Sequence, residues 1–131
     1  MTTPLWCLVI ITFLPIPLAV FGAVQRQKQF GVADNSNYRS SQVPKLEGLG
    51  ARAYAAQANA WEAVAMFTVA VVVAHLAGAE PQKSSLAAMV FVGARVLHAA
   101  FYLADLDKLR SAIFGVGTLS CVYLIVLAAQ A

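Results

Sequence analysis

The sequence predicts an all-α membrane protein, a bundle of four transmembrane helices, and two observations carry this prediction. First, 60% of the 131 residues are hydrophobic and only 11% are charged, against about 25% charged residues in a soluble domain. Second, the apolar residues come in blocks of about twenty, the length that crosses a hydrocarbon core of about 30 Å. We therefore expect a single membrane domain, with the lipid bilayer as its surroundings.

The apolar blocks predict four helices with polar connections between them. The first block follows no basic segment and is longer than the apolar region of a signal peptide, so we interpret it as a helix. Pro15 and Pro17 should kink that helix. Gly115 and Gly117 should allow close helix contact in the last one. The predicted helices cover about residues 4–24, 50–77, 86–104 and 111–129, with a polar loop at 25–49.

Basic residues are distributed unevenly between the two sides of the predicted bundle. Lys and Arg in short loops are retained on the cytoplasmic side, so both chain termini are expected on the other side. This topology also accounts for the net charge of +3, and no soluble module remains to bind nucleic acid. The basic side holds Arg26, Lys28, Arg39, Lys45, Arg52, Lys108 and Arg110, whereas the opposite side holds Lys83.

Two charged residues, Glu62 and Arg95, fall inside the predicted spans. A charge at the centre of a spanning helix costs about 2.5–3.5 kcal/mol on insertion scales. Both residues are expected at a similar depth, so their side chains can meet. A purely structural ion pair that fixes helix register is one interpretation. A functional polar site is the other.

Further polar residues share helix faces with these two charges and favour the functional interpretation. Spacings of three and seven residues place side chains on one helical face. The resulting pair of polar stripes, on two helices joined by a short turn, predicts a cleft for a polar and anionic molecule. The stripes comprise Arg95, His98 and Tyr102 on the third helix, and Arg52, Asn59 and Glu62 on the second.

Basic residues near the cytoplasmic rim could receive the carboxylates of such a molecule: Arg52, Arg110 and Lys28. Each of them, taken alone, is also explained by topology. No metal site is expected, because the two histidines, His75 and His98, should lie towards opposite membrane faces.

Two short motifs resemble signatures of the MAPEG family, the membrane-associated proteins of eicosanoid and glutathione metabolism. The run RAYAAQANAWE, Arg52–Glu62, resembles the family's second helix and its Asn-x-x-Glu pattern. The segment Arg95–Arg110, with its histidine, tyrosine and final arginine, is similar to the third helix and the following turn. The number of spans, the loop order and the length also fit, so the resemblance covers essentially the whole chain.

The resemblance implies a homotrimer that uses glutathione as co-substrate, bound between adjacent subunits near the cytoplasmic face. Arg110 would stabilise the glutathione thiolate. A lipophilic electrophile or hydroperoxide would be the second substrate of this transferase or peroxidase. The other residues expected to bind glutathione are Arg52, Gln57, Asn59, Glu62, Arg95, His98 and Tyr102, with Lys28 or Arg26 at the end of the first helix.

Two alternatives remain open at the level of sequence. Ala63 and Ala65 stand where the family can have tyrosine and proline, which suggests a divergent bacterial member in the inner membrane and favours a non-enzymatic, lipid-binding MAPEG fold. A small multidrug-type exporter is the other alternative. Such exporters carry a carboxylate in the first helix, and here that helix has no ionisable side chain.

Overall fold

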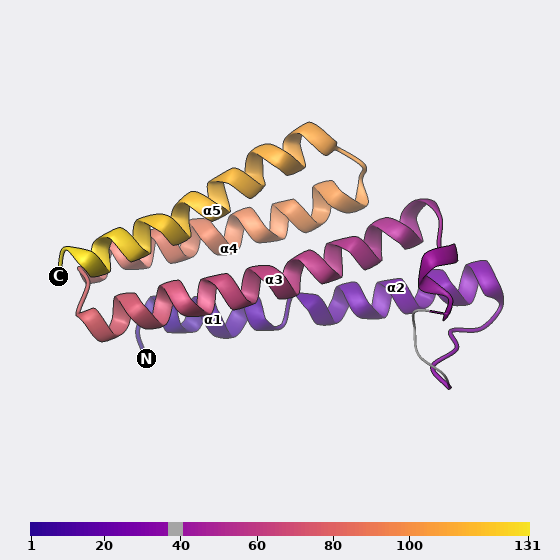
Figure 1. The fold of residues 1–131 in the computed structure, drawn as a ribbon, viewed down its shortest axis with the longest axis horizontal. Coiled ribbons are helices and arrows are strands. Elements are labelled where there is room, and N and C mark those ends of the chain that lie inside the picture. The colour runs from indigo at the N-terminus through magenta and orange to yellow at the C-terminus, as the bar shows by residue number, and fades with distance from the viewer. Residues whose placement is uncertain (37–40) are drawn as a thin grey trace.

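The computed structural model describes residues 1–36 and 41–131, and within them the regular structure is entirely helical. Four segments in this part of the chain are long and apolar enough to cross a membrane, as predicted. They pack as two antiparallel pairs, and the last two helices contact each other most extensively (Figure 1). The segments are α1 (Thr3–Thr12) with α2 (Pro15–Phe30), α3 (Gly48–Ala77), α4 (Pro81–Leu103) and α5 (Asp107–Ala129).

The first span is broken where its prolines predicted a kink. The helix stops after Thr12 and restarts at Pro15, because a proline has no N–H to donate to the preceding turn and its ring crowds that turn. The span then continues past the predicted end at residue 24 as far as Phe30, where Gly31 ends it with a φ of 80°. The polar residues after Val24 therefore extend the helix instead of forming a loop.

The last two helices begin earlier than predicted, at Pro81 and Asp107 instead of residues 86 and 111. Proline is favoured in the first turn of a helix because its missing N–H has no partner there anyway. The Glu80 side chain also accepts a hydrogen bond from the Gln82 N–H and so caps α4. Lys83 and Asp107–Arg110 thus belong to the first turns of helices, whereas Glu80 caps α4 and Asp105 stays in the turn.

Small residues allow the helices to pack closely. The buried face of α3 is mostly alanine, from Ala53 to Ala74, and the rings of Phe67 and Phe91 stack between α3 and α4 with centroids 4.0 Å apart. Gly117 faces α4, since a Cβ there would lie 3.5 Å from the Arg95 Cδ, whereas no described atom lies within 4 Å of such a Cβ at Gly115. Of these two glycines, Gly117 thus has the predicted role among the described residues.

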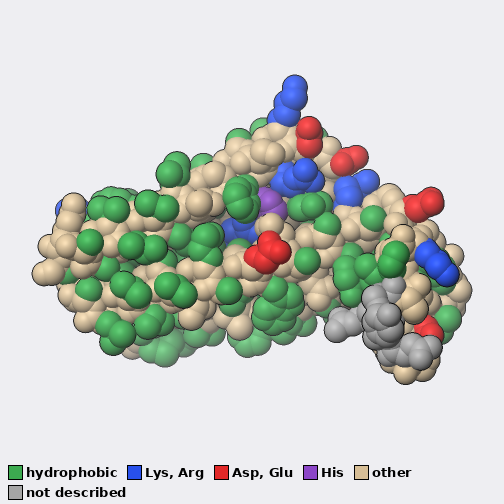
Figure 2. All heavy atoms as spheres, in the orientation of Figure 1, with side chains coloured by type: hydrophobic (Ala, Val, Ile, Leu, Met, Phe, Trp, Pro, Cys, Tyr) green, Lys and Arg blue, Asp and Glu red, His purple; other side chains and the backbone are tan. Residues whose placement is uncertain are grey.

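The two ends of the bundle differ in charge. Both termini and the α3–α4 turn lie at one end, and the α2–α3 connection and the α4–α5 turn lie at the other (Figure 1). That connection contains a short 3-10 helix, η2 (Val43–Lys45), while Arg39 lies outside the described residues. Acidic, basic and histidine side chains gather on the half of the visible face that carries the α2–α3 connection and the α4–α5 turn (Figure 2). The other half is largely hydrophobic and uncharged (Figure 2).

Candidate functional site

The centre of the site is a hydrogen-bonded chain of three side chains on α3 and α4. Arg95 is only 2% exposed. Its Nη2 donates to the main-chain oxygen of Asn59 at 3.2 Å and also to the Oδ1 of the same residue. The Asn59 amide in turn donates to the Oε2 of Glu62 at 3.4 Å. Arg95 and Glu62, the two charged residues inside the spans, are therefore connected through Asn59.

The direct Arg95–Glu62 ion pair considered from the sequence is not formed within the described residues. Asn59 precedes Glu62 by nearly one helical turn and lies over the guanidinium, whereas the Glu62 side chain lies on the exposed edge of α3. The amide thus separates the two charges. Glu62 keeps a second carboxylate oxygen free of any described hydrogen bond.

Phe114 on α5 is a site residue that the sequence reasoning missed. It lines a small pocket of about 100 Å³ together with Asn59, Glu62 and Arg95, and the Arg95 guanidinium lies 5.8 Å from its ring centroid. Its position four residues after Arg110 was the available signal, because residues four apart share a helix face.

A row of polar side chains, His98, Tyr102 and Arg110, continues from Phe114 towards the end of the bundle that carries the α2–α3 connection and the α4–α5 turn. The His98 ring lies 6.0 Å from Phe114 and 5.6 Å from Tyr102, the latter edge to face. The Arg110 guanidinium lies over the Tyr102 ring, 4.2 Å from its centroid, a cation–π contact that holds it against α4. Three predicted site residues, His98, Tyr102 and Arg110, are thus brought into one row.

Comparison with protein-family models decides which family these helices represent. The model of the MAPEG family matches residues 3–130, nearly the whole chain. The chain belongs to the MAPEG family. The comparison with curated proteins found no match, and neither did the comparison with solved structures.

The arginines of this MAPEG chain differ in how far the protein itself satisfies them. Arg52 donates its Nε to the Leu103 carbonyl at the end of α4, at 3.2 Å, and forms a 3.6 Å ion pair with Asp105. Arg110 is half-buried and, within the part of the chain described here, its side chain forms no hydrogen bond or ion pair. The guanidinium of Arg110 is therefore free of hydrogen-bond and ion-pair partners among the described residues and available to a ligand, whereas Arg95 is bound by Asn59 through Nη2 and keeps a buried Nε without a partner.

Arg26, the alternative to Lys28 at the end of the first span, is occupied by the loop that follows it. It is 3% exposed and donates to the Asp34 carbonyl, to Asn35 Oδ1 and to Gln42 Oε1 at 3.1–3.3 Å. The Ser36 hydroxyl and backbone N–H donate to the Asp34 carboxylate and hold its pKa below the usual value. This arginine organises the loop.

Besides Arg52, two predicted binding residues make no described contact with the row. Lys28 is exposed near the end of α2, and Gln57 is half-buried on α3, two residues before Asn59. Neither makes a hydrogen bond or ion pair with the row in the described segments. Their proposed contacts with a ligand therefore rest on the family pattern alone.

Proposed function

We propose that this chain is an integral membrane transferase or peroxidase that uses glutathione and acts on lipophilic electrophiles or hydroperoxides. Membership of the MAPEG family supports this class of activity. The observation that carries the proposal is the guanidinium of Arg110, which is positioned by the Tyr102 ring and has no carboxylate partner among the described residues.

Arg110 acts on the glutathione sulfur. An ordinary thiol has a pKa of about 8.5, so most of it is protonated at pH 7. A neighbouring guanidinium favours the thiolate, which is the nucleophile, and each unit by which the pKa falls corresponds to about 1.36 kcal/mol. In a transfer reaction, the thiolate forms a C–S bond with the electrophile, and the leaving group departs with its bonding electrons. In a peroxidase reaction, the thiolate attacks the hydroperoxide oxygen, the O–O bond breaks, and the alkoxide takes up a proton and leaves as the alcohol. A second glutathione then converts the resulting sulfenic acid to glutathione disulfide and water.

The remaining site residues hold glutathione in place. Asn59, Glu62 and Gln57 on α3 and Tyr102 on α4 contact it, with Glu62 offering its free carboxylate oxygen to the ammonium group. His98 contributes to the same wall of the site. Lys28 and Arg52 offer positive charge to the glutathione carboxylates, and Arg52 exchanges Asp105 for one of them.

A second subunit completes the site in this proposal. The pocket beside Arg95 measures about 100 Å³, whereas sites for drug-sized ligands occupy about 300–1,000 Å³. One chain therefore supplies one wall of a site for a tripeptide. A homotrimer, the assembly implied by the family resemblance, supplies the other wall.

The distribution of basic residues supports an orientation with the glutathione site facing the cytoplasm. The end of the bundle that carries the site also carries Lys108, Arg110 and the basic α2–α3 connection. Both termini then lie on the non-cytoplasmic side. The bacterial inner membrane is the proposed location.

Turnover by purified protein tests this function. Glutathione is supplied with a chloronitrobenzene in one assay and with a lipid hydroperoxide in another. Arg110→Ala should abolish both activities, and the matched variant Lys108→Ala should keep them, because it removes an exposed cation two residues away. Turnover by Arg110→Ala equal to that of the wild type would reject the assigned role.

A non-enzymatic lipid-binding protein of the same fold is the second candidate. One observation favours it: Arg52 already has two partners within the chain, the Leu103 carbonyl and the Asp105 carboxylate, so the fold does not need a ligand to satisfy it. Such a protein would show no turnover with either substrate and would bind lipid regardless of whether Arg110 is present.

A further inference from the structure

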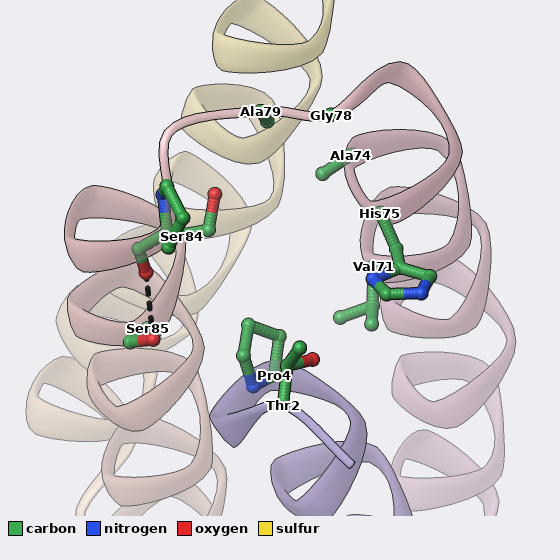
Figure 3. A pocket seen from close by; sticks show the side chains of 10 residues that line it. Thr2, Pro4, Val71, Ala74, His75, Gly78, Ala79, Ser84 and Ser85 are labelled. Atoms are coloured by element: carbon green, nitrogen blue, oxygen red, sulfur yellow. Dashed lines mark hydrogen bonds between the residues drawn. The ribbon is translucent and has the colours of Figure 1, made fainter.

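A larger pocket lies at the opposite end of the bundle from the glutathione site. It measures about 260 Å³ and lies between the end of α3 and the start of α4. The start of α1 forms its floor, and the turn at Gly78–Ala79 covers it (Figure 3). This end carries both chain termini (Figure 1). None of the residues assigned to the glutathione site lines it.

The walls of this second pocket are largely apolar. Val71 and Ala74 on α3 face Pro4 at the start of α1, and Ala79 of the turn completes the lining (Figure 3). Such walls favour an apolar molecule, because removing CH₂ groups from water into apolar surroundings is favourable. Since the pocket lies at the end of two spanning helices, its occupant would come from the membrane interface.

Polar groups gather on the same lining and can orient a ligand. His75 extends from the last turn of α3, and Ser84 and Ser85 line the opposite wall on α4 (Figure 3). An imidazole and a hydroxyl can each donate or accept a hydrogen bond. A few polar groups within apolar walls are the usual composition of a small-molecule site.

Ser84 is the residue that points to a ligand. It is 5% exposed, and its hydroxyl has no hydrogen-bond partner within the described residues. Other serines on these helices donate to the carbonyl four residues earlier: Ser85 at 2.7 Å, and Ser111 and Ser120 at 2.9 Å. A buried hydroxyl without a partner is unfavourable, because it has lost its hydrogen bonds to water and gained none in the protein. A ligand oxygen at this wall would supply the missing partner.

The lining also defines the class of ligand. No Lys, Arg, Asp or Glu belongs to it in the described chain, and the nearby Lys83 is paired with Glu80 at 3.4 Å. An ionised head group would therefore be buried without a counter-charge, which is costly. The volume is just below the range of about 300–1,000 Å³ for drug-sized ligands, so it fits a small molecule or one end of a chain.

We propose that the pocket between His75 and Ser84 binds the uncharged hydroxyl or carbonyl head of a lipophilic molecule, such as a long-chain alcohol. The Ser84 hydroxyl bonds the head oxygen, and His75 bonds it from the opposite wall. The apolar part lies against Pro4, Val71 and Ala74. This site does not depend on the proposed function, because it shares no residue with the glutathione site.

Photolabelling of the full chain in phosphatidylcholine nanodiscs tests this proposal. The probe is a long-chain alcohol that carries a diazirine, and labelled peptides are mapped. The wild type should be labelled within residues 71–85 or at the start of α1. Ser84→Ala should bind the probe about three- to tenfold more weakly, the effect of one neutral hydrogen bond.

Ser120→Ala is the matched control, because Ser120 is also buried but bonds Val116 and lies outside the pocket. It should be labelled like the wild type. Thermal unfolding without ligand checks folding, and Ser84→Ala should be at least as stable as the wild type since it loses an unpaired hydroxyl. An unlabelled long-chain alcohol should compete better than the corresponding fatty acid, and glutathione should not compete.

Three results would overturn the proposal. Equal affinity of Ser84→Ala and the wild type would show that the hydroxyl binds no ligand. Label confined to other peptides would place the alcohol elsewhere. Competition by glutathione would mean that the two sites are not separate.

Discussion

Arg95 on α4 is held by both oxygens of Asn59 on α3, the main-chain carbonyl and the side-chain amide. This contact joins the two helical pairs of the bundle at the depth where the polar row begins. It also places Asn59 where its amide can reach Glu62. The buried charge therefore has a structural role in positioning the carboxylate that we assign to glutathione binding.

Asn59→Ala should destabilise the protein by about 1.5–3 kcal/mol, the value of a hydrogen bond to a charged group. The main-chain bond remains, but the buried guanidinium loses its side-chain partner. Denaturation in detergent measures this effect. Gln57→Ala is the matched control and should change stability by less than about 0.5 kcal/mol. Equal effects of the two changes would contradict the role of Asn59.

Gly50→Ala should destabilise the packing of α2 against α3. A Cβ at Gly50 would lie 2.9 Å from the Leu46 Cδ2 and 3.3 Å from the Gln25 Cβ. Leu46 is buried, so its side chain and the Gln25 Cβ would both have to shift within packed surroundings, and we expect a cost of about 1–3 kcal/mol.

Gly93→Ala is the control for Gly50→Ala, because a Cβ there meets no described atom within 4 Å. This change should stabilise α4 by up to about 1 kcal/mol through helix propensity. Thermal unfolding of both variants should give shifts of opposite sign. A loss of stability in Gly93→Ala would indicate a subunit contact at that face.

Arg52→Ala should destabilise the protein more than Asp105→Ala. The Arg52–Asp105 ion pair is partly exposed, and such pairs contribute about 0–1 kcal/mol. Arg52 also binds the Leu103 carbonyl at the end of α4. Asp105 has a positive φ of 61°, a conformation that glycine adopts more readily than a residue with a Cβ. Asp105→Gly should therefore be nearly neutral.

A double-mutant cycle on Arg52 and Asp105 measures the ion pair alone. The coupling free energy should stay below about 1 kcal/mol. A coupling above about 2 kcal/mol would mean that the pair is shielded from water, and Arg52 would then be unable to exchange Asp105 for a glutathione carboxylate.

The four spans and the kink at Pro15 could be predicted from the sequence, because hydropathy and proline chemistry act locally. The starts of α4 and α5 could not, since charged residues suit both a turn and the first turn of a helix, and only the Glu80 cap and the packing decide between them. Tertiary geometry also decided the partner of Arg95. Glu62 offers the opposite charge, but Asn59 lies nearer the guanidinium.

Phe114 is a site residue that could not be identified from the sequence. A phenylalanine in an apolar span carries no signal of function by itself, and its contacts with Arg95 and His98 appear only once α5 is packed against α4. The sequence also does not show which arginine side chains are already hydrogen-bonded within the protein. Sequence treats Arg26, Arg52 and Arg110 as similar basic residues, and only the fold separates those already bonded from the one that remains available.

The ultraviolet absorbance of the glutathione thiolate, titrated against pH with purified protein, tests the central claim most directly. A bound thiol beside Arg110 should have a lowered pKa, so thiolate should form below pH 8.5 and be lost only as the pH falls through the new value. Lys108→Ala should give the same curve, and Arg110→Ala should shift it back towards about 8.5. A wild-type curve identical to that of free glutathione would contradict the account.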